Sequence, residues 1–109
     1  MGAGGAMSGG TFEVHARKLD DTGPPNSKYC LYKQDNTLKQ IRLYDANGYA
    51  WLNIDFTHGG EKHVFPHVHL WDWSKAAIGQ KPRGDDINLD KIEEKLEDWI
   101  CQIIKLNLL

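Results

Sequence analysis

Alternating apolar and polar positions predict a series of short β-strands over the first two thirds of the chain. We expect strands over residues 28–34, 38–44, 49–57 and 67–73, with a further short strand over residues 11–18. Successive side chains of a strand point to opposite faces, so the apolar positions of each strand share one face. In the last two strands the apolar set is Ala50, Leu52, Ile54, Phe56, Val68 and Leu70, and the opposite set is Trp51, Asn53, Asp55, His67, His69 and Trp71.

The turns between these strands favour an antiparallel order. Residues 45–48 end in Asn47 and Gly48, and an Asn-Gly pair accepts the positive φ angles of a tight hairpin turn. Asp35 and Asn36 mark a second turn. Short connections between consecutive strands favour a meander over crossovers. The breaker-rich run over residues 20–26 separates the first strand, as an arm, from the main body.

Beyond a second breaker region at residues 78–84, the apolar positions change to helical spacing. Asn88 is a suitable N-cap, and acidic residues occupy the other faces of the predicted helix. We expect this helix to cover the apolar face of the sheet, because a small sheet needs such burial to be stable. The predicted fold is α+β: a small antiparallel β-meander of about four strands packed against a C-terminal α-helix. The apolar stripe of the helix consists of Leu89, Ile92, Leu96, Trp99, Ile100, Ile103 and Ile104.

Size and composition limit the organisation and the surroundings of the chain. Its 109 residues have room for one domain. We interpret residues 1–10 as a flexible glycine-rich leader and residues 11–109 as a single α+β domain. No apolar run could span a bilayer and the N-terminus lacks signal-peptide features, which predicts a cytoplasmic protein without a membrane partner. Cys30 and Cys101 are expected to be buried thiols rather than a disulfide.

A cluster of histidines marks the part of the chain where chemistry is concentrated. Four of the five histidines fall within residues 58–69. His67 and His69 share the strand face opposite the predicted core, and Asp55 on the neighbouring strand points the same way if the register aligns. Trp51 and Trp71 would form an aromatic floor beside them. The four clustered histidines are His58, His63, His67 and His69.

Three interpretations of this cluster remain open at the level of the residues. Imidazoles titrate near neutral pH and serve as general acids and bases. A metal site is the second interpretation, with His58, His63, His67 and His69 as nitrogen ligands and Asp55 as an oxygen ligand. The third is a polar, hydrogen-bonded outer face without a reaction.

Basic residues near the cluster bear on the substrate. The formal net charge is −2, so a nucleic-acid substrate needs a local basic patch. Lys39 and Arg42 lie on the second strand of the main body at opposite parity, so only one can share the face of the site. Lys75, Lys81 and Arg83 follow the histidine strand and can swing over its end. Such cations would hold an RNA phosphate and stabilise charge in the transition state.

Several motifs together resemble a bacterial family. They are Pro25–Asn26–Ser27, LKQIRLYD over residues 38–45, Gly48, DFTH over residues 55–58, FPHVHLWDW over residues 65–73, and Arg83. The sequence is similar to the C-terminal domain of phage minor capsid proteins and bacterial polymorphic toxins, mainly of Gram-positive bacteria and their prophages. The resemblance covers about residues 25–84.

The resemblance implies a metal-independent endoribonuclease without a cofactor. RNA would be the substrate, and an immunity protein or a phage subunit would be the partner. In the mechanism that we expect, His69 or His67 is the general base, the other histidine or His58 is the acid, and Asp55 lies beside them. Arg42 or Arg83 would clamp the phosphate. The remaining predicted substrate-binding residues are Lys39, Trp71 and Trp51.

Two other functions stay open. The domain could be a non-enzymatic interaction module of a phage or prophage, whose aromatic and histidine face or apolar helix docks a partner. The helix would then be the seam of a homodimer. Alternatively, the domain binds zinc or another transition metal through the histidine cluster.

Overall fold

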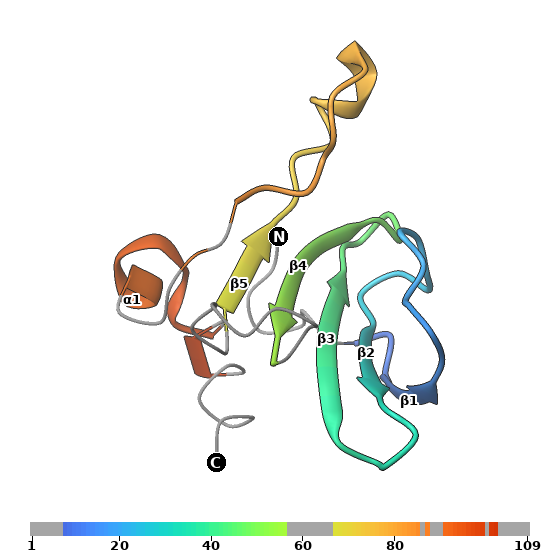
Figure 1. Ribbon diagram of the computed structural model, residues 1–109. Helices are drawn as coiled ribbons and strands as arrows, with labels where there is room; N and C mark the ends of the chain where they lie inside the picture. Colours follow the sequence, from blue (N-terminus) through green and yellow to red (C-terminus); the bar gives the residue numbers. More distant parts are fainter. Residues whose placement is uncertain (1–7, 57–66, 86, 88–90, 100, 103–109) are drawn as a thin grey trace.

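The computed structural model contains one five-stranded mixed β-sheet with the strand order β1-β2-β3-β4-β5 (Figure 1). The structure describes residues 8–56, 67–85, 87, 91–99 and 101–102. β2, β3, β4 and β5 pair in an antiparallel manner. The strands are β1 (Thr11–His15), β2 (Lys28–Tyr32), β3 (Leu38–Tyr44), β4 (Ala50–Asp55) and β5 (His67–Leu70).

The first strand departs from the predicted meander. β1 pairs with β2 in parallel, with Thr11 opposite Lys28 and His15 opposite Tyr32. A parallel pair requires a crossover of about a dozen residues, and residues 16–27 provide a connection of that length. The prediction of a purely antiparallel sheet is therefore wrong. The breaker-rich run separates β1 from the main body in sequence, but the strand rejoins the sheet at its edge.

The predicted C-terminal helix is also wrong. α1 spans Ile92–Lys95, and the described residues beyond it form only short helical pieces. Among the described residues the fold is therefore mostly β, and no long helix packs against the sheet. The apolar spacing still identifies buried positions, because Leu96, Trp99 and Cys101 pack against the core. Short helical turns joined by a break satisfy the same spacing as one continuous helix. The homodimer that we expected through this helix stays a prediction.

The hydrophobic core lies on one face of the sheet. Its buried residues come from β2, β3, β4, β5 and the C-terminal segment, and both cysteines belong to it as free thiols. The predicted apolar set is confirmed for Leu52, Ile54 and Val68, which are fully buried, and for Phe56 and Leu70, which pack against them. Ala50 is also buried, but it lies beyond a register shift and does not belong to this cluster. The buried members are Cys30, Ile41, Leu43, Leu52, Ile54, Val68 and Cys101.

The β3–β4 turn has the predicted positive φ at Gly48 but not at Asn47. Gly48 adopts a φ of 82°, and its backbone N–H donates to the carbonyl of Asp45 at 3.0 Å. Gly48 also accepts a hydrogen bond from the backbone of Gly23 at 2.8 Å. This hydrogen bond holds the β1–β2 connection against the turn.

A protruding arm, residues 71–85, follows β5 and returns along its edge (Figure 1). The short 3-10 helix η2 (Ala76–Ile78) lies in the exposed part of the arm. On the return, Gly84 donates its N–H to Leu70 O at 2.7 Å, and Ile87 exchanges two backbone hydrogen bonds with Val68. The returning chain thereby covers the edge of β5.

Two further expectations concern the ends of the chain and membranes. Residues 1–7 of the predicted leader lie outside the described residues, whereas the backbones of Gly9 and Gly10 bond to Asn26 and Lys28. Within the described part of the chain, none of the helices has the length and apolar character that crossing a membrane requires.

Candidate functional site

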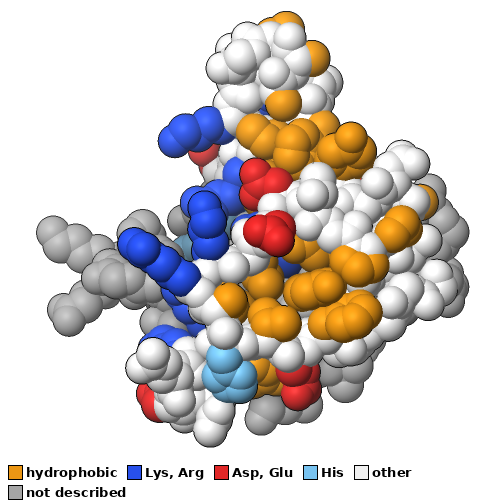
Figure 2. Space-filling model, turned by 90° about the vertical axis from the view of Figure 1, so that its right-hand side faces the viewer, with side chains coloured by type: hydrophobic (Ala, Val, Ile, Leu, Met, Phe, Trp, Pro, Cys, Tyr) orange, Lys and Arg blue, Asp and Glu red, His pale blue; other side chains and the backbone are white. Residues whose placement is uncertain are grey.

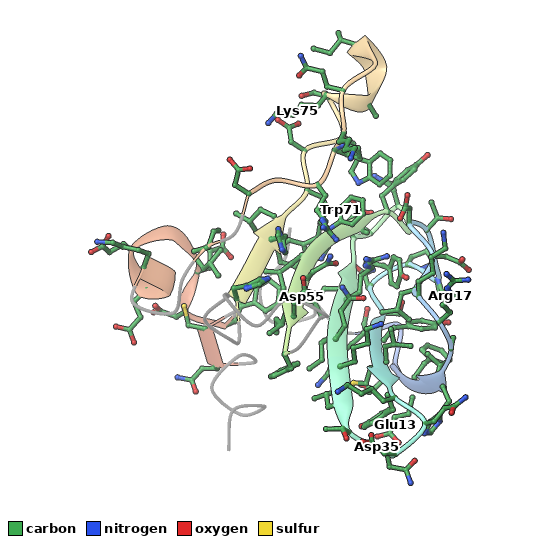
Figure 3. The ribbon with its side chains drawn as sticks, viewed as in Figure 1. Glu13, Arg17, Asp35, Asp55, Trp71 and Lys75 are labelled. Carbon is green, nitrogen blue, oxygen red and sulfur yellow. The ribbon has the colours of Figure 1, made fainter. Side chains whose placement is uncertain are left out.

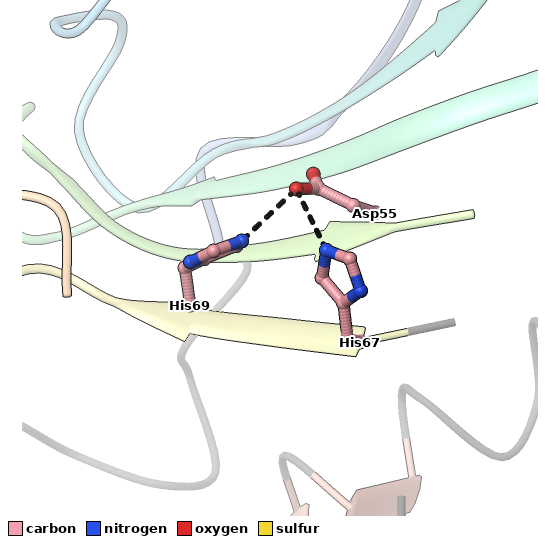
Figure 4. A group of neighbouring side chains, drawn as sticks. All are labelled: Asp55, His67 and His69. Atoms are coloured by element: carbon pink, nitrogen blue, oxygen red, sulfur yellow. Dashed lines mark ion pairs between the residues drawn. The ribbon is translucent and has the colours of Figure 1, made fainter. Parts of the chain in front are cut away.

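Asp55, His67 and His69 form one acid–base cluster on the sheet face opposite the core (Figure 4). β4 and β5 align so that Asp55 lies opposite His67, and Asn53 lies opposite His69. The predicted strand parity is therefore confirmed for these three side chains. All three are buried, with exposed fractions of 7% for Asp55, 2% for His67 and 5% for His69. A carboxylate and two imidazoles removed from water in this way have to satisfy one another.

His69 bridges the carboxylate and the returning arm. Its Nδ1 lies 2.7 Å from Gly84 O, and its Nε2 lies 3.2 Å from Asp55 Oδ2. A carbonyl oxygen only accepts hydrogen bonds, so Nδ1 carries a proton. An ionised carboxylate also accepts only, so Nε2 must carry a second proton to bond to Asp55. With both nitrogens donating, His69 is an imidazolium paired with a carboxylate.

The pKa values of the pair shift in the directions that this ion pair requires. Burial acts to raise the pKa of Asp55, but hydrogen bonds from His69 and Gln40 and the charge of His69 outweigh burial and lower it. Burial acts to lower the pKa of His69, but the hydrogen bonds to Asp55 and Gly84 and the charge of Asp55 raise it. Both shifts favour the charged forms of the two groups.

Two further side chains complete the surroundings of the carboxylate. His67 places its Nε2 3.7 Å from Asp55 Oδ2, and its ring stands edge-on to that of His69 at 5.1 Å between centroids. Gln40 on β3 donates from Nε2 to Asp55 Oδ1 at 2.6 Å. The carboxylate thus receives donors on both oxygens, which fixes its orientation.

Arg42 forms a second buried cationic centre beside the cluster. Its Nε donates to Asn53 Oδ1 at 2.7 Å, and its Nη1 donates to the carbonyls of Leu19 and Asp20 at 2.9 and 3.0 Å. The guanidinium also lies over the ring of Trp71, 5.0 Å from the centroid. A guanidinium bound on so many sides is a positioned charge that ties the β1–β2 connection to the sheet.

A basic groove of about 930 Å³ runs over this face of the sheet and reaches Asp55. Figure 2 shows Lys and Arg side chains gathered in a band on this side of the molecule. A second, smaller hollow reaches His69, and both hollows are lined by Lys81 and Arg83. Six basic side chains line the groove, against three acidic ones: Arg17, Lys18, Lys39, Arg42, Lys81 and Arg83 against Asp20, Asp21 and Asp55.

The groove is assembled from elements that are far apart in sequence. Figure 3 shows Arg17 on the β1–β2 connection, Asp55 at the end of β4 and Trp71 at the base of the arm. Hydrogen bonds of the β1–β2 connection to Gly48 and Arg42 place its basic residues on the same face as the cluster. The local basic patch that a net-acidic protein needs to attract a polyanion is therefore present.

The structure brings most of the predicted site residues together, but not all of them. Trp51 instead lies against Trp99, with 5.5 Å between ring centroids and 49° between the ring planes, and packs against the core. His58 and His63 lie outside the described residues. Lys39 and Arg42 both line the groove, so the prediction that only one of them can share the face of the site is wrong. The predicted residues that meet at the cluster or line the groove are Asp55, His67, His69, Arg42, Lys39, Trp71 and Arg83.

Five residues that contribute to the site were not predicted as site residues. Gln40 shares the strand face of Arg42, so period-2 geometry could have identified it. Asn53 was placed on the correct face, and it accepts hydrogen bonds from both Arg42 and Trp71. The Gly84 carbonyl and the basic pair Arg17 and Lys18 depend on how distant segments fold back. The alternation of residues along a strand cannot predict these long-range contacts.

Comparison with known proteins yields no relative. No family model matches the chain, and neither a curated protein nor a solved structure is significantly similar to it. The resemblance to phage capsid and toxin domains stays a prediction that depends on the motifs alone.

Proposed function

We propose that this domain cleaves RNA at a phosphodiester bond without a metal ion. The observation that carries the proposal is the junction of the acid–base cluster with the basic groove. Asp55 lines the groove, His69 lines the adjoining hollow, and Lys81 and Arg83 line both. A phosphate bound by Lys81 and Arg83 would therefore lie next to a protonated imidazole.

The ion pair indicates the role of each member of the cluster. Asp55 and His69 are 3.2 Å apart, which leaves no room for a phosphate between them, so they act as one unit. The His69 imidazolium gives its proton to the leaving 5′ oxygen, and Asp55 keeps that imidazolium charged until then. His67 takes the proton of the attacking 2′-OH. Contacts between catalytic groups and substrate often tighten only when the substrate binds.

The bond changes of this reaction define its products. The 2′ oxygen bonds to phosphorus as the bond from phosphorus to the 5′ oxygen breaks, and Arg83 and Lys81 neutralise the charge on the non-bridging oxygens. One product ends in a 2′,3′-cyclic phosphate, and the other begins with a 5′-OH. An RNA that lacks the 2′-OH cannot react in this way.

The test is incubation of the purified protein with labelled single-stranded RNA in excess EDTA. We expect cleavage to 2′,3′-cyclic phosphate ends, and a loss of about 100-fold or more in rate for His69→Ala and His67→Ala, as is typical for general acid–base groups. His15→Ala is the matched control, because His15 is an exposed histidine on β1. Circular dichroism of each variant checks that the fold is retained.

Two results would contradict the proposal. Cleavage that persists in folded His67→Ala and His69→Ala proteins would remove these histidines from the reaction. An equal loss in His15→Ala would show that the effect is not specific to the cluster.

A second candidate function, metal binding, is favoured by one specific observation. One ligand atom each from Asp55, His67 and His69 lies within 4.8 Å of the others. His69 also donates from Nδ1 to the carbonyl of Gly84, which is the contact that commonly orients a metal-ligating imidazole. The three residues would hold a transition metal such as zinc through two nitrogens and one oxygen.

The same preparation distinguishes the two candidates. Metal binding predicts about one equivalent of metal in protein purified without an affinity tag, and loss of that metal in His69→Ala. It also predicts that EDTA abolishes any RNA cleavage. Metal-free protein that cleaves at full rate in EDTA would exclude this candidate.

A further inference from the structure

Three aromatic side chains form an aromatic ladder, Tyr49–Trp73–Trp71, at the base of the arm. The rings of Trp71 and Trp73 are nearly parallel, with 19° between their planes and 5.6 Å between centroids. Tyr49 follows at 5.2 Å from Trp73 with a tilt of 53°. Tyr49 is 45% exposed, so the ladder ends in a ring that is open to solvent.

Hydrogen bonds hold the two indoles of the ladder in place. Trp73 donates from Nε1 to Ala50 O at 2.6 Å, and Trp71 donates from Nε1 to Asn53 Oδ1 at 3.2 Å. Both acceptors belong to β4, so the rings are fixed to the sheet rather than to the exposed part of the arm. A ring that is already ordered loses little entropy when a ligand stacks on it.

The ladder leads directly into the basic groove. Trp71 lines the groove and carries the guanidinium of Arg42 over its ring. In Figure 2 a hydrophobic patch lies below the arm and next to the band of Lys and Arg side chains. An exposed aromatic platform beside a cationic track is the combination that binds single-stranded nucleic acid, because rings stack on bases while cations follow the phosphates.

We propose that the aromatic ladder binds unpaired bases, so that the substrate class is single-stranded rather than duplex nucleic acid. A base stacks on the exposed ring of Tyr49, while the phosphates of the same strand lie in the basic groove. Bases inside a duplex are paired and stacked on each other, and they present no free face to Tyr49. This inference rests on the proposed function, since the strand that stacks here is the one that reaches the cluster.

The experiment measures binding of an oligodeoxyuridylate of about twelve nucleotides, a length within the usual site size for such strands. This probe lacks the 2′-OH, so binding is separated from cleavage. We expect Tyr49→Ala to weaken binding about fivefold or more, as loss of one stacked base does. Tyr49→Phe, which keeps the ring, should bind like the unmodified protein. Phe12→Ala is the matched control, because Phe12 is an exposed aromatic, 39% accessible, that stacks on Tyr29.

Binding of a duplex of the same length completes the test. We expect weaker binding of the duplex, and no effect of Tyr49→Ala on it. The inference is overturned if Tyr49→Ala leaves oligodeoxyuridylate binding unchanged, or if it weakens duplex and single strand equally. If the expected pattern is found while the EDTA assay shows no RNA cleavage, the ladder stands as a binding site and the proposed reaction fails.

Discussion

The Asp55–His69 ion pair shows how a buried polar site is kept charged. Removing a carboxylate and an imidazole from water is costly for the charged forms. The cost is offset because Asp55 accepts from both His69 and Gln40, and His69 donates to both Asp55 and Gly84. The pair is therefore also a source of pH-dependent stability.

The sign of that dependence follows from the two pKa shifts. The lowered pKa of Asp55 gives stability that is present above its ordinary value of 3.8 and is lost as pH falls through the folded-state value. The raised pKa of His69 gives stability that is present below its ordinary value of 6.5 and is lost as pH rises through the folded-state value. Both contributions are complete between these two ordinary values.

Replacement of Asp55 by Asn tests this dependence. We expect the variant to lose about 1–3 kcal/mol of unfolding free energy near the middle of that pH window, because a buried charged partner is removed. The deficit should shrink towards both lower and higher pH. Urea denaturation over a series of pH values measures it, with Asp98→Asn, an exposed carboxylate, as the control. A deficit that is constant with pH would argue against the charged pair.

For single residues, the sequence predicts the sheet face to which a side chain points, but not the side chains that it contacts. Period-2 alternation placed Asp55, His67 and His69 on one face correctly. The same rule placed Trp51 with them, but its ring packs on Trp99 in the C-terminal segment. The pairing of β3 with β4 has a register shift between Leu43 and Tyr44, opposite the part of β4 that holds Trp51. At such an irregularity the side chains need not alternate regularly between the two faces.

Among the elements, the β3–β4 turn connects local conformation to the assembly of the groove. Gly48 has a positive φ, and a Cβ added there would lie 2.4 Å from the carbonyl oxygen of Gly23. The close approach of the two backbones depends on the absence of a side chain. Gly48 therefore serves both the turn and the docking of the β1–β2 connection that carries Arg17 and Lys18.

Replacement of Gly48 by Ala tests this double role. Gly79→Ala is the matched control, because Gly79 has a φ of 78° but no atom within 4 Å of an added Cβ. We expect Gly79→Ala to cost about 1 kcal/mol for its backbone conformation alone. Gly48→Ala should cost a further ~1–3 kcal/mol, since the backbones must also move apart. Equal losses in urea denaturation would show that the contact with Gly23 contributes nothing.

The elements that were predicted wrongly share a physical cause. The bounds of β3 are those predicted, because its alternation and its turns are local signals. The parallel pairing of β1 with β2 is a choice between distant strands, which local alternation does not encode. The apolar stripe after residue 88 reports burial against the core, and burial does not require one continuous helix.

On the scale of the whole molecule, the site forms only when segments that are distant in sequence fold together. The cluster comes from two adjacent strands, the basic groove from the β1–β2 connection, β3, β4 and the arm, and the ladder from the turn and the arm. A chain with a formal net charge of −2 thereby concentrates six basic side chains on one face. Composition could not predict this concentration, because it depends on which loops fold over which strands.

The central claim is that a polyanionic strand binds on the face that holds the acid–base cluster. NMR of isotope-labelled protein during titration with oligodeoxyuridylate tests it most directly. We predict the largest shifts for the ring N–H groups of His69, Trp71 and Trp73 and for the backbone of Arg83. The turn at Asp35, which Figure 3 shows at the far end of the sheet, should not respond. Shifts confined to that turn or to α1, with the groove residues unchanged, would contradict the account.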